Sequence, residues 1–326
     1  MKCINNSRIG IVILIVCTFL VTGCSQTTYG APYVTMTSIA PTLTSSLSSE
    51  YVLTSFASDL CVLSSETETY GITMDVEELS GVGLFDLSQQ DVLYAKNIHT
   101  TLYPASLTKV MTAIVVLKYA DLDTVITVTE PIVFDEWGVT TIGIEAGDQL
   151  TMEQALHLLL ICSANDAAVI IANEIGGSIE GFSELMNEEA LLIGATNTNF
   201  VNPHGLHDDN QYTTVYDMYL IMNEAITYSK FNDITSMSSY NTVTYNTSGT
   251  EVAFECNSSN RFILGTEEAP SGIVVAGGKT GTTEMAGHCL VIHGKDSSGN
   301  SYIAIILNAP QRDLIYEKMI ELLSEI

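Results

Sequence analysis

The apolar segment at residues 107–119 limits most strongly how this chain can fold. It has no glycine or proline, and Lys109 and Lys118 are its only charged residues. Because it is too long for a strand, it predicts a buried helix that begins at about Ala105. Ser106 then lies at the amino-terminal end of this helix, about one turn before Lys109.

The segments around this helix predict strands at both ends of a folded body and helices between them. Apolar residues at 82–87 and 91–95 predict a β-hairpin, and Thr151 with Gln154 predicts a capping box that opens a second helix, ending near Cys162. The further expected elements are helices at 166–175, 181–193 and 216–226, then segments of strand character, strands at 278–283, 289–294 and 301–308, and a helix at 314–326. This order predicts an α/β chain of the α+β type, with one antiparallel sheet built from both chain ends, packed with helices, and a helical subdomain.

The charge of the chain is strongly negative. Eleven Lys and Arg stand against 38 Asp and Glu, which gives a formal charge of -27. Such a chain does not bind nucleic acid, and any attachment to an anionic membrane must be hydrophobic or covalent. The closing helix carries Glu317, Glu321 and Glu325 opposite its apolar face, so we expect it to pack on the sheet rather than on a membrane.

The amino terminus predicts a covalent attachment. Lys2 and Arg8 precede or border an uncharged apolar run at 9–21, and Cys24 follows shortly after it. The run is too short to cross a bilayer, and small residues before a cysteine resemble the lipobox of bacterial lipoproteins. The alternative is a plain secretory signal with an incidental cysteine. The expected organisation is a signal peptide at 1–23, a lipid on Cys24, a flexible Ser/Thr-rich tether at 24–57 and a folded body at 58–326.

Four cysteines remain in the folded body, in a compartment that permits disulfides. Three full pairings are possible among them, and the sequence does not choose between these pairings. No Cys-x-x-Cys or His-Glu-x-x-His spacing is present, so neither a metal nor another cofactor is predicted. His204 and His207 lie in a Pro-His-Gly-Leu-His stretch that indicates a turn rather than a metal site. The four cysteines are Cys61, Cys162, Cys256 and Cys289.

Ser106 and Lys109 share one face of the predicted helix, so the serine hydroxyl and the lysine amine can meet. A lysine with its ordinary pKa is charged at neutral pH and is no base, but burial and a second cation would lower that pKa. A neutral Lys109 could then take the proton of Ser106 and make it a nucleophile for acyl transfer. Taken alone, this Ser-x-x-Lys spacing is equally typical of a helix-start serine followed by a surface lysine.

Two further short motifs supply polar groups suited to the same chemistry. Ser163 and Asn165 lie at a junction between predicted buried helices, where inward-facing polar groups suit a proton shuttle and a hydrogen bond to substrate. Residues 279–281, Lys-Thr-Gly, form part of a strand with glycines on both sides, against which a substrate backbone can lie. Lys279 offers a cation to a carboxylate. Each motif alone also fits an ordinary helix junction or surface hairpin.

Together and in this order, Ser-x-x-Lys, Ser-x-Asn and Lys-Thr-Gly are the motif set of penicillin-recognising serine enzymes. The residues at 93–97 (LYAKN), 103–113 (YPASLTKVMTA), 200–206 (FVNPHGL) and 279–283 (KTGTT) closely resemble the low-molecular-mass D-alanyl-D-alanine carboxypeptidases. The resemblance covers about residues 60–326. It implies a DD-peptidase/β-lactamase-like fold. It also implies a serine peptidase that removes the terminal D-alanine from peptidoglycan stem peptides and is acylated by β-lactam antibiotics.

The resemblance further implies a role for each matching residue. Ser106 would be the acylated nucleophile and Lys109 its base, with Ser163 relaying the proton to the leaving D-alanine. The backbone N–H groups of Ser106 and Thr282 would form the oxyanion hole. Arg312 is as well explained as a surface arginine. The implied substrate-binding residues are Asn165 on the substrate amide, Lys279, Thr280, Gly281 and Thr282 near the terminal carboxylate, and Arg312.

Two alternative functions use the same three motifs. A class A β-lactamase also needs a glutamate that activates the deacylating water, and Glu184 is the nearest candidate. It lies in an apolar-periodic helix beside Phe182 and Leu185, which indicates a solvent-facing position. A β-lactam sensor would stay acylated, but such sensors usually adjoin membrane-spanning helices, and none is predicted here. The expected location is the extracytoplasmic face of the bacterial cell membrane, anchored by the lipid.

Overall fold

The computed structural model describes residues 59–63, 65–67, 72, 74, 76–136 and 138–326. The chain divides into two compact units, Met1–Thr54 and Ser55–Ile326, and all described residues belong to the second unit. The expected signal peptide at 1–23, the lipid on Cys24 and the tether at 24–57 lie outside the described residues.

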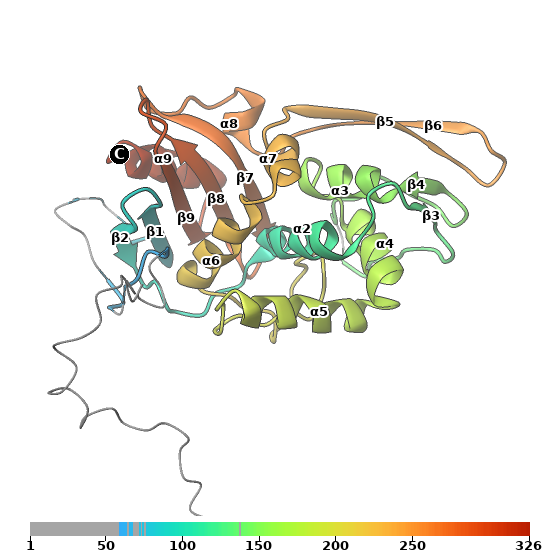
Figure 1. Ribbon diagram of the computed structural model, residues 1–326, viewed down its shortest axis with the longest axis horizontal. Helices are drawn as coiled ribbons and strands as arrows, with labels where there is room; N and C mark the ends of the chain where they lie inside the picture. The colour runs from blue at the N-terminus through green and yellow to red at the C-terminus, as the bar shows by residue number, and fades with distance from the viewer. Residues whose placement is uncertain (1–58, 64, 68–71, 73, 75, 137) are drawn as a thin grey trace, which may run out of the picture. The chain divides into compact units, whose positions relative to one another are not determined.

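A five-stranded antiparallel sheet joins the two ends of the described chain, as expected from the sequence (Figure 1). Its strand order is β2-β1-β9-β8-β7, so the early hairpin pairs directly with the last strand. Gly81 lies opposite Leu307, and Asp86 lies opposite Tyr302. The strands are β1 (Gly81–Asp86), β2 (Asp91–Lys96), β7 (Val274–Thr283), β8 (Gly287–Lys295) and β9 (Ser301–Ala309).

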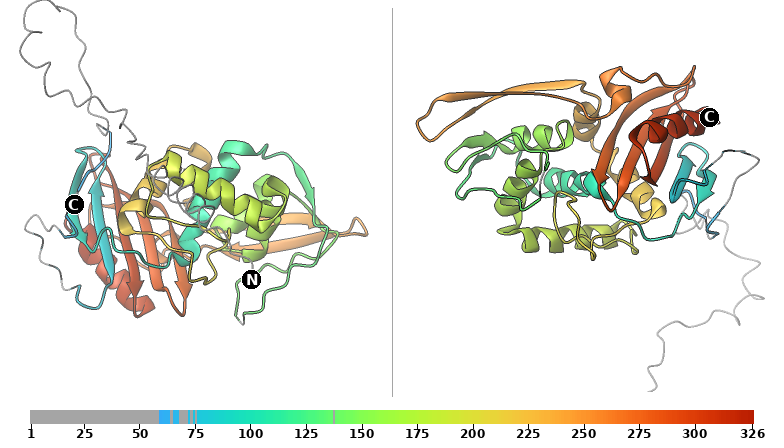
Figure 2. Two further views of the ribbon diagram at one scale, coloured as in Figure 1. Left: turned by 90° about the horizontal axis from the view of Figure 1, so that it is seen from below. Right: turned by 180° about the vertical axis from the view of Figure 1, so that it is seen from behind.

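The central strands of this sheet are apolar on both faces because helices cover both. In β9, Ile303, Ile305 and Leu307 face the main core, whereas Ala304 and Ile306 face the opposite side. On that side they meet helix α9 (Arg312–Leu323), and helix α6 (Val215–Ala225) packs on the other face (Figure 2). The prediction that the closing helix packs on the sheet is therefore confirmed.

The predicted buried helix is present as a 3-10 turn, η1 (Ala105–Leu107), followed by α2 (Thr108–Tyr119). Most of α2 is buried because α3 (Met152–Leu160), α4 (Asn165–Gly176), α5 (Ile179–Leu192) and α6 pack around it. The predicted capping box at Thr151 is present: its hydroxyl accepts from the Gln154 N–H, and the Gln154 side chain accepts from the Thr151 N–H.

A second sheet, which the sequence does not predict as a sheet, has the order β3-β4-β5-β6. The Thr/Tyr/Val-rich segments of strand character become its long hairpin, β5 (Ser239–Tyr245) and β6 (Glu251–Asn257), which runs beside α3 in Figure 1. Its other strands, β3 (Val125–Thr127) and β4 (Gln149–Thr151), are too short to give a periodic signal. The short helices α7 (Ser229–Thr235) and α8 (Arg261–Leu264) were missed for the same reason.

Of the pairings left open for the four cysteines, the structure forms one bond, between Cys162 and Cys256. Cys61 and Cys289 are free, buried thiols whose sulfurs donate to the carbonyls of Asp86 and of Tyr103 and Ala286. Within the described part of the chain, no helix is both long and apolar enough to cross a membrane.

Candidate active site

The first motif places a hydroxyl and an amine in contact at the start of the buried helix. Lys109 Nζ lies 3.0 Å from Ser106 Oγ. Ser106 is half-buried on η1, and Lys109 is completely buried one turn later on α2. Ala105, just before the serine, has a positive φ of 47°, a backbone conformation that non-glycine residues rarely adopt. The strained residue therefore lies directly before the expected nucleophile.

Two further oxygen atoms surround the Lys109 amine. Its Nζ donates to Asn165 Oδ1 at 2.8 Å and to the His204 carbonyl at 2.5 Å. Both partners are acceptors of neutral groups rather than carboxylates. Burial, and next the nearby charge of Lys279, hold the pKa of Lys109 well below its usual range, and Asp166 opposes this shift. Burial and the neighbouring cation thus both favour the uncharged form of this amine.

The second and third motifs are in direct contact. Lys279 Nζ donates to Ser163 Oγ at 2.8 Å and to the Thr280 carbonyl at 2.9 Å. Burial lowers the pKa of Lys279 to about 7. Ser163, between α3 and α4, has a positive φ of 59°, so its backbone is also strained. The three motifs therefore form one cluster, which the sequence predicted from their co-occurrence.

Strand β7 approaches the expected nucleophile because it has no side chain at Gly281. A Cβ on Gly281 would lie 2.8 Å from the Ser106 backbone nitrogen, closer than real Cβ contacts. Thr282 is the next residue on the strand, is exposed, and its hydroxyl lies 3.0 Å from His288 Nδ1. The predicted oxyanion-hole donors, the N–H groups of Ser106 and Thr282, thus belong to backbone segments that lie against each other.

The predicted carboxylate ligands on and near β7 differ in their surroundings. The Thr280 hydroxyl lies 2.6 Å from Ser259 Oγ, so it already has a hydrogen-bond partner within the chain. Arg312 is exposed as the first residue of α9. Burial, and then the Arg312 charge, lower the pKa of His288, whose Nδ1 lies 3.0 Å from the Thr282 hydroxyl. Arg312 stays a predicted ligand.

Asn165 also has a structural role, which the sequence did not predict. While its Oδ1 accepts from Lys109, its Nδ2 and its backbone N–H both donate to the Thr140 carbonyl, at 3.0 and 2.9 Å. The adjacent Asp166 carboxylate accepts from the N–H groups of Ile142 and Gly143. These bonds fasten the loop before β4 to the start of α4, and the predicted contact of Asn165 with substrate stays a prediction.

The loop at 202–206 is a functional element whose role the sequence did not predict beyond a turn. The turn itself is present: Asn202 Oδ1 accepts from the Gly205 N–H, and Gly205 has a φ of +87°. Gln211 holds the loop through the N–H of Asn202, and Thr112 holds it through the Pro203 carbonyl. This places the His204 carbonyl on the Lys109 amine. A backbone acceptor leaves no residue-type signal in a sequence.

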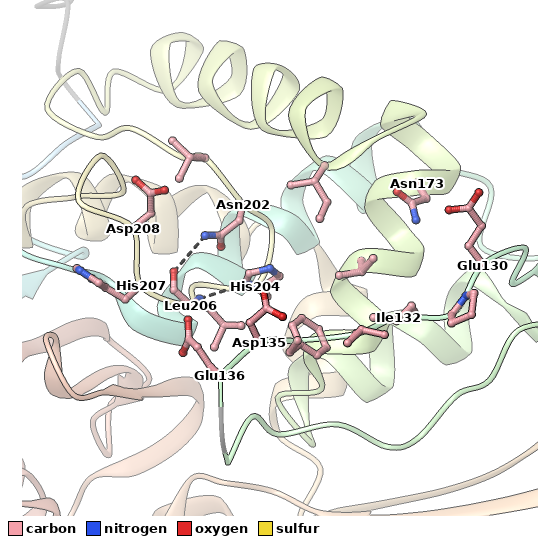
Figure 3. Close-up of a pocket in the computed structure, with 16 residues that line it drawn as sticks. Glu130, Ile132, Asp135, Glu136, Asn173, Asn202, His204, Leu206, His207 and Asp208 are labelled. Atoms are coloured by element: carbon pink, nitrogen blue, oxygen red, sulfur yellow. Dashed lines mark hydrogen bonds between the residues drawn. The ribbon is translucent and has the colours of Figure 1, made fainter.

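The His204 ring itself is buried and forms a hydrogen bond within the loop. Its Nδ1 accepts from the Leu206 N–H, one of the bonds drawn in Figure 3. Burial, and then the Lys109 charge, lower the pKa of His204 to about 3, so the ring is neutral. Figure 3 also shows the Asn202 side chain bonded to the Leu206 carbonyl across the same loop.

Two cavities flank this loop. The one in Figure 3 has a volume of about 510 Å³ and opens beside His204, with carboxylates around it. The other, of about 680 Å³, is lined by Thr282 at the end of β7 and by His288 on β8. The two share Glu136 and Leu206. The carboxylates of the first cavity are those of Glu130, Asp135, Glu136 and Asp208.

Comparison with solved structures supports the fold. The chain aligns with the crystal structure of the Streptomyces K15 DD-transpeptidase at a TM-score of 0.69 and 24% sequence identity, over 78% of this chain and 100% of the other. This likeness establishes the DD-peptidase/β-lactamase-like fold predicted from the sequence.

Two curated relatives have a higher sequence identity with this chain than that solved structure has. The D-alanyl-D-alanine carboxypeptidase DacF of Bacillus subtilis is 32% identical over 236 residues, which is 71% of this chain and 58% of the relative. The corresponding enzyme DacA of Haemophilus influenzae is 30% identical over 272 residues, 81% of this chain and 64% of the relative. The chain thus spans about three fifths of the length of these two relatives.

The family model that matches is that of the S11 peptidases, described as D-alanyl-D-alanine carboxypeptidase, and it covers residues 80–311. That range includes η1 with Ser106, the α3–α4 junction with Ser163, and β7 with Lys279. This chain belongs to the S11 family of D-alanyl-D-alanine carboxypeptidases.

Proposed function

We propose that this protein is a serine-type D-Ala-D-Ala carboxypeptidase that acts on peptidoglycan stem peptides and is acylated by β-lactams. The observation that carries the proposal is the set of partners of Lys109. A neutral amine has two N–H donors and one lone pair. Lys109 Nζ contacts three oxygens: Asn165 Oδ1, the His204 carbonyl, and Ser106 Oγ at 3.0 Å. In the uncharged amine that the proposal requires, the first two would accept its N–H groups and the lone pair would face the Ser106 hydroxyl.

In the proposed acylation, Lys109 Nζ takes the proton of Ser106, and Ser106 Oγ attacks the carbonyl carbon between the two D-alanines. The N–H groups of Ser106 and Thr282 stabilise the negative charge on the carbonyl oxygen, a contribution of roughly 3 kcal/mol per donor. Ser163 relays that proton from Lys109 to the nitrogen of the leaving D-alanine, so both residues return to their starting protonation states, and Lys279 faces the terminal carboxylate. Water then cleaves the ester and restores Ser106.

The β-lactamase alternative is not favoured. Glu184, its candidate for activating the deacylating water, is exposed on α5 as the sequence predicted, whereas the Lys109 amine is buried. The family match and the named relatives are carboxypeptidases.

The decisive experiment incubates the protein with a diacyl tripeptide that ends in D-Ala-D-Ala and, separately, with a labelled penicillin. We expect release of D-alanine and a slowly decaying penicillin adduct on Ser106, and Ser106→Ala should abolish both because the nucleophile is gone. Fast penicillin turnover would instead indicate a β-lactamase, and a permanent adduct without D-alanine release would indicate a sensor. Either result overturns the proposal.

The proposal includes a lipid anchor on Cys24 that holds the enzyme at the extracytoplasmic face of the membrane. Its support is the apolar run at 9–21 that ends just before this cysteine. Cys24→Ser should move the protein from the membrane fraction to the soluble fraction, because the acyl chains would be lost. Membrane retention of this variant, compared with Ser25→Ala as a control, would show that the anchor lies elsewhere.

A further inference from the structure

One short segment of chain contacts both the second and the third motif. Cys256, near the end of β6, forms the disulfide with Cys162, the residue just before Ser163. Three residues after Cys256, Ser259 Oγ lies 2.6 Å from the Thr280 hydroxyl, next to Lys279. We name residues 256–259 the bracket segment. It connects the chain on which Ser163 lies with the strand on which Lys279 lies.

We infer that the Cys162–Cys256 disulfide, together with Ser259, positions Ser163 against Lys279 and so sets the rate of the proposed acylation. Cys162, Cys256 and Ser259 are positioning residues in this account, because none of them contacts the expected nucleophile. The inference rests on the proposed function.

Ser163 needs such support because its conformation is unfavourable by itself. Its φ of 59° lies in the left-handed region, which a non-glycine residue keeps only when its surroundings fix it. After Ser163, the chain is fixed by the buried Ala164, whose N–H donates to the Leu158 carbonyl at 3.2 Å. Before it, the disulfide holds Cys162, with 5.7 Å between the two Cα atoms.

The other end of the disulfide is anchored independently of it. Cys256 pairs with Tyr240 in the β5–β6 hairpin, and the Tyr240 ring stacks on His157 of α3 at 4.4 Å. Gln154 Nε2, also on α3, donates to Thr242 Oγ1 and to the Val243 carbonyl. These contacts should keep the hairpin on α3 after the disulfide is cut, so the loss should be local to Ser163.

The bracket segment is also fixed at its far end. The Ser258 N–H donates to the Ser238 carbonyl, and the Ser258 hydroxyl accepts from the Asn260 N–H. Asn260 is buried and caps α8 by accepting from the Phe262 N–H. These bonds hold Cys256 and Ser259 at a fixed spacing, so the bracket segment supports Ser163 and Thr280 from one rigid piece of chain.

Selective reduction of this bond in the folded protein is feasible. Cys162 and Cys256 are both partly exposed, so a dithiol can reach them. Burial raises the pKa of Cys61 to about 11 and that of Cys289 to about 12, so these two thiols react slowly. Dithiothreitol supplies two electrons and two protons, becomes a cyclic disulfide, and leaves two cysteine thiols, whose alkylation is read by peptide mass.

The test measures D-alanine release and the rate of Ser106 acylation by labelled penicillin in the full chain. We expect the reduced protein and Cys162→Ser/Cys256→Ser each to lose at least about tenfold in kcat and in acylation rate, with KM nearly unchanged, since misplacing a positioned group lowers rate. Dithiothreitol should not affect the double variant further. Cys61→Ser, which removes the buried thiol that donates to the Asp86 carbonyl, should keep the acylation rate of the unsubstituted protein.

The Ser259→Ala variant tests the second contact of the bracket segment. Combined with Cys162→Ser/Cys256→Ser, it should lose less activity than the product of the separate losses, because residues that act as one unit are not additive. Independent, multiplicative effects would limit the inference to the disulfide and overturn the role of Ser259.

Two outcomes distinguish failure of this inference from failure of the proposed function. An oxidised protein that releases no D-alanine contradicts the proposed function, while its penicillin acylation rate still measures the positioning. An unchanged acylation rate after verified reduction overturns the positioning, even if D-alanine is released. Reduction of the native protein keeps the test valid if the serine variants fail to fold.

Discussion

Replacing Lys109 with methionine is expected to lower the rate of Ser106 acylation roughly 10²–10⁴-fold, the usual contribution of a positioned general base. Methionine keeps most of the buried volume and removes the amine, so no large cavity forms. The carbonyls of Asn165 and His204 lose a donor, which costs about 1–3 kcal/mol each in stability. Stopped-flow labelling with a penicillin measures the rate, and thermal unfolding measures the stability.

The pH dependence of acylation separates the base from a structural role. In the unsubstituted protein the rate should rise with pH as Lys109 loses its proton, at a pH well below the usual lysine pKa. Lys109→Met should lose this rise. Lys230→Ala, which removes a partly exposed lysine paired with Glu153, is the control and should change neither rate nor profile. An acylation rate in Lys109→Met close to that of the control would contradict the base assignment.

Gly205→Ala is expected to damage both the fold and the site. Gly205 has a φ of +87°, and an added Cβ would lie 2.0 Å from the Ala105 carbonyl oxygen and 3.0 Å from the Ser106 nitrogen. Backbone lies on both sides of this contact, so one segment must move. We expect a loss of about 3 kcal/mol or more in the free energy of unfolding. Acylation should fall as well, because the displaced segments carry Ser106 and the His204 carbonyl.

Gly265→Ala supplies the matched control for this prediction. Gly265 has a similar φ of +77°, but nothing lies within 4 Å of its added Cβ. It should therefore lose only the cost of the left-handed conformation, about 1–2 kcal/mol, and acylate at the normal rate. Chemical denaturation of the two variants compares their stabilities. Equal losses would mean that the close approach of the 202–206 loop to Ser106 does not exist.

The parts of the fold that follow from sequence are those with a strong local signal. The apolar run at 107–119 predicted the buried helix, and Thr151 with Gln154 predicted where α3 begins. The second sheet could not be predicted from the sequence, because β4 pairs with β5 through a single residue pair, Gln149 with Tyr245. That pairing is set by tertiary packing, and no periodicity in either segment reports it.

The site was predictable where chemistry depends on side-chain type. Ser106, Lys109, Ser163 and Lys279 were found from motifs, and the structure brings their polar atoms together. The contacts that the sequence did not predict are made by the backbone, above all the hydrogen bond from the Lys109 amine to the His204 carbonyl. Any residue type offers a carbonyl, so only the folded chain shows which one is used.

The pairing of β1 with β9 has a consequence for the timing of folding. Gly81 lies opposite Leu307, so the ladder that carries β8 and β7 joins residues from nearly opposite ends of the folded body. Pairings so distant along the chain form slowly and late. A nascent polypeptide therefore lacks a complete ladder until synthesis of the last strand has finished.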